Sequence, residues 1–272
     1  QAQSWLSWPL HAFFRGFNRG FEWLSSRYGR MTGRLVRVSL IMVILYAGLI
    51  GLVVKRMPFA AWEPPSPERL NLRAIMRRVS ALKVMAQQEK NRAHAADHTA
   101  EITRLIARDV DQHILQLSRH VEKLEDEAYA IVQSQPDLAV DYARLTSVRG
   151  IARVSALHIL SELAVLSPDM SARQWVAHAG LDPRHHDSGT SIHKPARISR
   201  RGNRHLRTAL FLPAMVAAQH EPQVRAFYDR LVARGKTKLQ AIVAVMRKLL
   251  HAIHGMLRTN TDFRGEKFYA IA

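Results

Sequence analysis

The sequence predicts a mainly α-helical chain with three parts: an N-terminal transmembrane-like helix, a long helical hairpin or coiled-coil stalk, and a compact all-helical C-terminal domain. Three observations carry this prediction. A charge-free apolar run occupies residues 38–54, apolar residues recur at three- and four-residue steps from about residue 102 onward, and the last third of the chain is strongly basic. The 272 residues include no cysteine, which excludes disulfide-stapled folds and cysteine-ligated zinc sites.

The net charge of +18 is distributed in blocks. Residues 1–59 carry a net charge of +7, residues 60–144 carry −1 and residues 145–272 carry +12. Cationic surfaces meet either anionic lipid headgroups or nucleic-acid phosphates, so the two basic ends need not share a partner. We therefore expect three domains with these boundaries.

The run at residues 38–54 predicts a membrane-spanning helix. Its seventeen residues carry no charge, which is near the lower limit for crossing a hydrocarbon core of about 30 Å, and basic residues close the run on both sides. Upstream, over residues 5–28, aromatic residues alternate with arginines, as in a helix that lies at a membrane interface. The alternative is a buried core helix, for which the rest of the chain offers no comparable apolar face.

The proline-rich segment WEPPSPE separates this region from the stalk. Ser66 is expected to cap the next helix, with Pro67 at its first position, and that helix is mostly polar up to about residue 95. The second stalk helix has an apolar stripe, formed by Ile102, Ile106, Val110, His113, Leu117, Val121, Leu124, Ala128 and Ile131. The pattern predicts an antiparallel hairpin or a coiled coil, which is either a spacer or a dimerisation stalk over residues 66–134. We interpret His113 as a core or register-setting histidine rather than a metal ligand.

The C-terminal domain opens with a glycine turn at Gly150. Residues 145–163 resemble a helix-hairpin-helix, in which turn N–H groups and a helix N-terminus bind phosphate without reading bases. Arg149 and Arg153 flank the turn and add positive charge. A plain helix-turn-helix packing unit explains the same pattern. The following helix is expected to bury Ala156, Ile159, Leu160 and Leu163.

Residues 181–202, after a short helix over residues 171–179, lack apolar periodicity and are expected to form a long polar loop. Hydroxyl side chains gather in its SGTS segment, and six cations follow within fourteen residues. These cations are Lys194, Arg197, Arg200, Arg201, Arg204 and Arg207. Asn203 is expected to cap the next helix. The direct physical interpretation of the cluster is neutralisation of nucleic-acid phosphates.

A serine beside such a cluster can also attack phosphorus. An exposed hydroxyl next to charge-neutralised phosphate oxygens can form a phosphoserine link that a second strand later displaces. Ser188 has these neighbours and Ser191 is the reserve, although a Ser-Gly-Thr-Ser segment is more commonly a simple turn. His185 and His186 are near enough to move a proton. With His193 they find no carboxylate or cysteine at ligand spacing, so no metal site is predicted.

Several motifs together resemble the insertion-sequence 110 group of transposases. In chain order they are WEPPSPE, QQEKNR, RGIARVSALHILSEL, AHAGLDPR, SGTS, ARISRRGNRHLRTAL and RAFYDRLVARGKTKLQAIVAVMRKLLHAIHGMLRT. The resemblance covers residues 62–258, about seven-tenths of the chain. It implies a DNA recombinase with an RNase H-like domain that bears a metal-binding acidic tetrad, a dimerising coiled-coil stalk, and a C-terminal domain with a nucleophilic serine. It also implies a structured guide RNA as a partner.

Carried onto this sequence, the resemblance assigns the nucleophile to the serine before glycine in SGTS, which is Ser188. The family's acidic tetrad, which binds a divalent metal such as magnesium, lies before the WEPPSPE position. Here Glu22 is the sole acid in residues 1–59, and one carboxylate cannot assemble such a site. We therefore expect a truncated transposase that binds DNA, holds no cofactor in this chain and is inactive alone.

The front of the chain resembles a different family. FNRGFEWLSSRYGRMTGRLVRVSLIMVILYAGLIGLVVKRMP is similar to a mid-chain transmembrane helix of resistance-nodulation-division efflux transporters, through its Phe-Asn-Arg start, Tyr28 and Gly29, and the exit at Arg56 and Pro58. Proton-relay residues and periplasmic domains do not fit in this stretch, so the resemblance implies a junction near residue 60 rather than a pump. We expect a cytoplasmic, nucleoid-associated protein, with inner-membrane association if residues 38–54 insert. The alternative function is a non-catalytic nucleic-acid-binding module tethered to a membrane.

Overall fold

The computed structural model describes residues 7–56, 64–97, 104–188 and 192–270, and it describes their side chains except at 7–16, 18, 96, 97 and 185–196. The chain divides into two compact units, Gln1–Glu63 and Pro64–Ala272. The described residues are mainly helical, with a single two-stranded ribbon among them, which confirms the predicted fold class.

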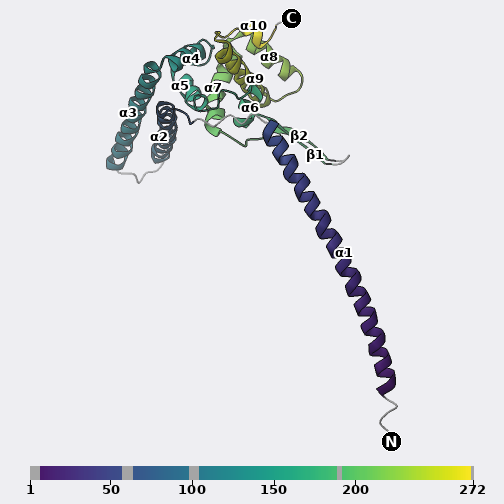
Figure 1. Cartoon of the computed structure of the whole chain (residues 1–272). Coiled ribbons are helices and arrows are strands. Elements are labelled where there is room, and N and C mark those ends of the chain that lie inside the picture. Colours follow the sequence, from purple (N-terminus) through teal and green to yellow (C-terminus); the bar gives the residue numbers. More distant parts are fainter. Residues whose placement is uncertain (1–6, 57–63, 98–103, 189–191, 271–272) are drawn as a thin grey trace. The chain divides into compact units, whose positions relative to one another are not determined.

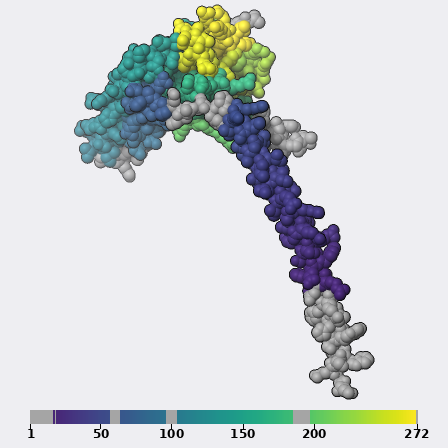
Figure 2. All heavy atoms as spheres, in the orientation of Figure 1, coloured from purple at the N-terminus to yellow at the C-terminus, as the bar shows by residue number. Residues whose placement is uncertain are grey.

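The first unit contains α1 (Ser7–Arg56), a helix of 50 residues (Figure 1). Its described side chains are exposed, and the space-filling view shows them on the surface of a rod (Figure 2). The helical segment Arg19–Arg56 contains an 18-residue stretch that is apolar enough to cross a membrane, with a mean hydropathy of 2.4. This stretch is 0% buried, which differs from the buried core helix considered as the alternative.

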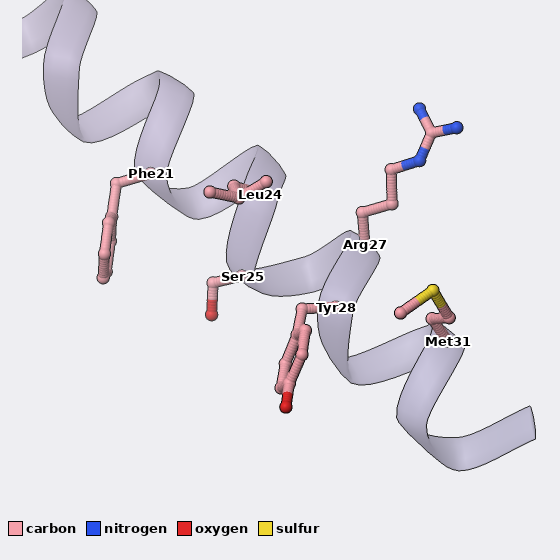
Figure 3. Close-up of a pocket in the computed structure, with 6 residues that line it drawn as sticks. All are labelled: Phe21, Leu24, Ser25, Arg27, Tyr28 and Met31. Atoms are coloured by element: carbon pink, nitrogen blue, oxygen red, sulfur yellow. The ribbon is translucent and has the colours of Figure 1, made fainter. Parts of the chain in front are cut away.

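A shallow hollow on α1 is lined by Phe21, Leu24, Ser25, Arg27, Tyr28 and Met31 (Figure 3). All six residues come from consecutive turns of one helix. Phe21 and Tyr28 project to one side and Arg27 to the other (Figure 3). The hollow is therefore a groove between side chains of α1, and it carries no argument for a ligand site.

The second unit is a helical bundle that carries the ribbon, and it forms one continuous body in the space-filling view (Figure 2). Its helices are α2 (Pro67–Asp97), α3 (Arg104–Ser134), α4 (Pro136–Thr146), α5 (Arg153–Leu163), α6 (Ala172–His178), α7 (Arg204–His220), α8 (Pro222–Ala233), α9 (Lys238–Thr259) and α10 (Gly265–Phe268). The strands β1 (Pro183–Ser188) and β2 (Ile192–Ile198) pair antiparallel. As predicted, Ser66 precedes Pro67 at the start of α2, and its Oγ accepts the N–H of Arg69 at 3.4 Å.

The helices α2 and α3 form an antiparallel hairpin, one of the two arrangements that the stripe predicted. The Nζ of Lys83 lies 2.7 Å from Oε1 of Glu125, and Oε1 of Glu89 lies 3.5 Å from Nδ1 of His113. Because the residue numbers rise along α2 while those of their partners fall along α3, the two helices run in opposite directions.

Only part of the predicted stripe faces the core. Leu117, Val121 and Ala128 are buried, as predicted. Ile106 is 51% exposed, and the side chain of His113 is 47% exposed, so His113 does not lie in the core, which was one of the two roles considered for it. The imidazole lies at the edge of the hairpin against the Glu89 carboxylate, where a polar contact replaces apolar packing. Ile102 lies outside the described residues.

One hydrophobic core joins the stalk to the C-terminal helices. Leu72 and Met76 of α2 are buried in the same cluster as residues of α5, α7 and α9. The inward face predicted for α5 is confirmed, since Ala156, Ile159, Leu160 and Leu163 are all at most 5% exposed. The helix α5 is therefore a central element on which both the stalk and the basic segment pack.

Candidate nucleic-acid interface

The segment predicted as a long loop, residues 181–202, instead contains the β1–β2 ribbon. Ser188 pairs with Ile192, His186 with Lys194 and Arg184 with Arg197. The register shifts by one residue between Arg184 and His186, which leaves Pro195 in the irregularity, where a strand tolerates a residue without an N–H. Two short runs joined by three residues that include glycine are a hairpin signal. The lack of apolar alternation hid that signal.

The base of the ribbon is clamped by backbone hydrogen bonds. The N–H of Ser199 donates to the carbonyl oxygen of Asp182 at 2.9 Å, and the N–H of Arg200 donates to that of Gly180 at 3.1 Å. Gly180 has φ +65, and a Cβ at this position would lie 2.7 Å from the carbonyl oxygen of Arg201. Glycine is therefore required where the two arms of the segment meet. In Figure 1 the ribbon extends from this base away from α6 and α7.

A tight turn follows the ribbon and starts α7. Gly202 has φ +125, and a Cβ there would lie 2.3 Å from the carbonyl oxygen of His178. The next N–H, of Asn203, donates to that same oxygen at 2.6 Å. The Asn203 side chain accepts the N–H groups of His205 and Leu206 at 2.9 and 3.1 Å, which confirms the predicted cap.

Five arginines lie along the end of β2, the turn and the start of α7, and we call them the arginine corner. It consists of Arg197, Arg200, Arg201, Arg204 and Arg207. The first four are exposed, and none of them takes part in an ion pair or side-chain hydrogen bond among the described residues. Arg207 is half-buried, and its Nη1 donates to the carbonyl oxygen of Ala179 at 2.8 Å.

The electrostatics of Arg207 indicate that two members of this cluster, Arg200 and Arg204, lie near it. Burial lowers the pKa of its guanidinium, and the positive charges of Arg200 and Arg204 lower it further. Arg200 also has φ +53, a conformation uncommon for a residue with a side chain. Like charges held close together and a strained backbone both cost free energy, and a bound polyanion offsets the repulsion.

A buried carboxylate lies beneath the arginine corner. Glu162 of α5 is 2% exposed, and its oxygens accept Arg77 of α2 at 2.8 and 3.0 Å and Nδ2 of Asn203 at 2.6 Å. Burial by itself raises the pKa of Glu162, but the hydrogen bonds from Arg77 and Asn203 outweigh it, so the pKa lies below its ordinary value. Sequence reasoning missed this group, because a single acid in an apolar helix carries no spacing signal.

Three histidines around this carboxylate have lowered pKa values. Burial is the main cause at His158, whose pKa falls to about 4, with a further contribution from Lys83. Burial also lowers the pKa of His178 and of His205, while the charge of Glu162 raises both. These imidazoles are therefore neutral near neutral pH.

The Gly150 turn, residues 147–153, is engaged within the chain. A Cβ at Gly150 would lie 2.8 Å from the carbonyl oxygen of Pro213, so the turn packs closely against α7. Nη1 of Arg149 donates to the carbonyl oxygen of His220 at 2.8 Å. Arg153 donates to Oδ1 of Asp126 at 2.6 Å and stacks on an aromatic ring. Gly150 and both flanking arginines therefore have close contacts within the chain.

Some predicted site residues fall beyond what the structure describes. Ser191 lies outside the described residues. Ser188 and Lys194 have described backbone positions in the ribbon, and their side chains, with those of His185, His186 and His193, lie outside the description. Within the described part of the chain, no group of three or more His, Asp or Glu side chains can hold a metal ion.

Comparison with known proteins shows what residues 142–229 of the second unit are similar to. Residues 142–229 match the model of the transposase IS116/IS110/IS902 family. The chain is 31% identical over 203 residues to the pilin gene-inverting proteins of Moraxella lacunata and Moraxella bovis, covering 74% of this chain and 61% of each relative. It is 35% identical over 140 residues to the uncharacterized 43.6 kDa protein of insertion element IS110 from Streptomyces coelicolor, covering 52% of this chain and 33% of that protein.

The chain thus spans 61% of the length of the pilin gene-inverting proteins that it matches. The matched residues 142–229 include both basic regions, the Gly150 turn and the arginine corner, as well as the whole β1–β2 ribbon. Residues 142–229 of this chain are therefore similar to the transposases of the IS116/IS110/IS902 family.

Proposed function

We propose that this chain is a DNA-recombination protein of a mobile element, in which the arginine corner binds the sugar-phosphate backbone. The observation that carries the proposal is the set of four exposed arginines from the end of β2 to the start of α7, which have no side-chain partner among the described residues and lie within residues that match a transposase family. Guanidinium groups bind phosphate oxygens in pairs, and their positive charge replaces the counterions of DNA. The contacts are to the backbone, so they position the protein without reading bases.

A salt titration tests this binding step. The full chain, solubilised in a mild detergent, is mixed with a fluorescent DNA duplex, and anisotropy is measured over a salt series. Four phosphate contacts predict that the logarithm of the association constant falls with the logarithm of the salt concentration with a slope of about −3.6. A slope near zero contradicts the proposal.

We further propose that Ser188 is the nucleophile, with Ser191 as the reserve. Ser188 Oγ forms a bond to phosphorus, the bond from phosphorus to one deoxyribose oxygen breaks, and the serine proton leaves while the departing oxygen gains one. A hydroxyl of a second strand then displaces the serine, which conserves the number of phosphodiester bonds. The position of Ser188 at the end of β1 and its place before glycine in the family-matched segment support this assignment.

A covalent adduct tests the nucleophile. We expect a protein–DNA adduct that survives denaturing electrophoresis and is lost in Ser188→Ala but retained in Ser191→Ala. An adduct that persists in Ser188→Ala overturns the assignment. The chain taken alone is expected to give no complete transposition products, because residues 1–59 carry one acid, Glu22, where the resemblance places an acidic tetrad. Such products from the purified chain would refute this expectation.

Two partners complete this proposal. We propose that the stalk dimerises, because Val84, Met85, Leu105, Ile106 and Leu115 expose apolar side chains on the hairpin. Sedimentation in detergent is expected to give a dimer that dissociates in Leu105→Glu with Ile106→Glu.

The guide RNA that the resemblance implies is the second partner. Sequencing of RNA that copurifies with the chain tests it, and only random cellular RNA would contradict it.

The second candidate function is a non-catalytic basic module tethered to a membrane. The exposed apolar helix α1 favours it, because an unburied stretch of mean hydropathy 2.4 has a large free-energy gain from entering lipid. A tethered chain remains in the membrane fraction after an alkaline carbonate wash and gives no covalent DNA adduct. Release of the whole chain by carbonate contradicts this candidate, and adduct formation rules out the non-catalytic part.

A further inference from the structure

The carboxylate of Glu162 occupies a place where packing alone favours a hydrocarbon side chain. Its neighbours on α5 include the buried apolar residues Ile159, Leu160 and Leu163 as well as the polar Ser161, and Glu162 itself is 2% exposed. A buried carboxylate has a desolvation cost that only well-placed donors offset, and apolar replacements of buried ion pairs are commonly as stable. The charge therefore points to a role beyond holding α5 in the core.

Both oxygens of this carboxylate accept hydrogen bonds, and the donors come from two residues, Arg77 and Asn203. Arg77 Nε donates to Oε1 at 2.8 Å and Arg77 Nη2 donates to Oε2 at 3.0 Å, in a bidentate pair. Asn203 Nδ2 donates to the same Oε2 at 2.6 Å. Three donors thus converge on one group, and only an ionised carboxylate has acceptors for all of them.

The contact to Asn203 determines which way that amide faces. An asparagine has one oxygen and one NH₂ group, so an NH₂ that is held by Glu162 directs the oxygen to the opposite side. There the oxygen accepts the N–H groups of His205 and Leu206 and begins α7. The other neighbour of the NH₂ group, Nε2 of His178, lies 3.4 Å away and is a weaker contact.

The residues beside Asn203 are the arginine corner. Arg200 and Arg201 precede the cap, and Arg204 and Arg207 follow it on the first turn of α7. Arg207 experiences the positive charges of Arg200 and Arg204, so this arrangement must be held against mutual repulsion. The bond between Glu162 and Asn203 ties the backbone at the middle of the cluster to the core.

From this geometry we propose that Glu162 is a positioning residue that orients Asn203 and thereby sets the arginine corner for phosphate. Arg77 extends the same network to the stalk helix α2, so the arginine corner and the stalk share one buried anion. The proposal rests on the function proposed above, since it assumes that the arginine corner binds a nucleic-acid backbone. It adds two residues, Glu162 and Arg77, that need not touch the DNA.

The test compares two variants with a control of matched stability, all in the full chain. Glu162→Gln removes an acceptor, so that one of the three donors faces an NH₂ group. Asn203→Ser keeps the helix cap and loses the bond to Glu162. Val245→Ala creates a small cavity in the core, at a residue of α9 that is 0% exposed. Melting temperatures establish that each variant is folded.

We expect Glu162→Gln and Asn203→Ser each to weaken DNA binding at least tenfold and to make the salt slope shallower by about one to two units. The double variant is expected to be no weaker than the worse single variant, because both changes disrupt the same hydrogen-bond network around residue 162. Val245→Ala is expected to keep the native slope. Native affinity and slope in folded Asn203→Ser overturn the proposal, as does an equal loss in Val245→Ala.

Amide hydrogen exchange separates this proposal from the function on which it rests. In the free chain, the N–H groups of His205 and Leu206 are expected to exchange faster in Glu162→Gln than in the native chain, and at the native rate in Val245→Ala. If the native chain does not bind DNA but exchange accelerates as expected, the binding function fails and the positioning role stands. If the native chain binds DNA and the exchange rates are unchanged in Glu162→Gln, the positioning role is contradicted and the binding function stands.

Discussion

Two basic regions of the same domain differ in what their arginines already bind. At the Gly150 turn, Arg149 and Arg153 each donate to another part of the chain. In the arginine corner, four exposed arginines have no such partner among the described residues. The positive charge of a segment therefore does not locate a phosphate site by itself, since the guanidinium groups must also be free to bind a ligand.

The largest expected effect comes from removing the unpaired charges. Changing Arg197, Arg200, Arg201 and Arg204 to Gln is expected to weaken DNA binding by about 10²–10³-fold near physiological salt, because four phosphate contacts are lost. Anisotropy with a labelled duplex measures the loss. Arg149→Gln with Arg153→Gln is the matched control, and it is expected to change the affinity by less than about threefold. Equal losses in both variants would erase the difference between the two regions.

The next effect concerns the turn that builds the arginine corner. Gly202→Ala is expected to lower the free energy of unfolding by at least about 3 kcal/mol, because its Cβ meets a backbone oxygen at a strained φ. Gly235 also has a positive φ, +81, but no atom lies within 4 Å of a Cβ there. Gly235→Ala is therefore the control, with a cost of about 1 kcal/mol. Urea unfolding measures both values, and similar costs would contradict the close approach at Gly202.

The pH dependence of stability tests the burial of His158 in α5, the helix that runs from the Gly150 turn to the buried carboxylate Glu162 and Leu163. The pKa of His158 in the folded chain is about 4, below the value of about 6.5 in the unfolded chain. Between these values the unfolded chain binds the extra proton, so stability is lost as the pH falls from about 6.5 to about 4. We expect this group to contribute about 2–3 kcal/mol to the loss. Urea unfolding at several pH values measures it, and His158→Phe should flatten the curve.

The smallest expected effect comes from freeing Arg153, so that the Gly150 turn also has an arginine without a partner, as the arginine corner does. Asp126→Asn removes the carboxylate that pairs with Arg153, a pair in which both side chains are about half exposed or more. The stability cost is expected to be below about 1 kcal/mol, as for other surface ion pairs. The freed guanidinium is expected to tighten DNA binding about twofold, measured by anisotropy. Weaker binding in this variant would mean that the ion pair itself supports the interface.

Local features of the fold could be predicted from the sequence because their causes are local. The caps at Ser66 and Asn203 depend on residue type and on the few amides that follow. The inward face of α5 follows from apolar spacing around a helical turn. The ribbon escaped prediction because its pairing depends on a base clamped by Gly180 and Asp182, and its polar strands lack an apolar face.

The sequence predicts which residue types the candidate site contains, but it does not show which of the arginines already have partners within the chain. Proximity in the sequence groups the cations of residues 194–207 as a phosphate site, and this remains a prediction. It gave equal weight to Arg149 and Arg153, whose partners His220 and Asp126 lie 71 and 27 residues away along the chain. It also offered no reason to single out Glu162.

The sequence by itself determined the helices, their caps, the blocks of charge and the family-like motifs, because each depends on neighbours a few residues apart. Only the tertiary structure decided which arginines are free and which are used. Arg77, Glu162 and Asn203 come from three helix regions up to 126 residues apart and meet at one carboxylate. Such a meeting depends on how α2, α5 and α7 pack, and no local pattern in the chain encodes it.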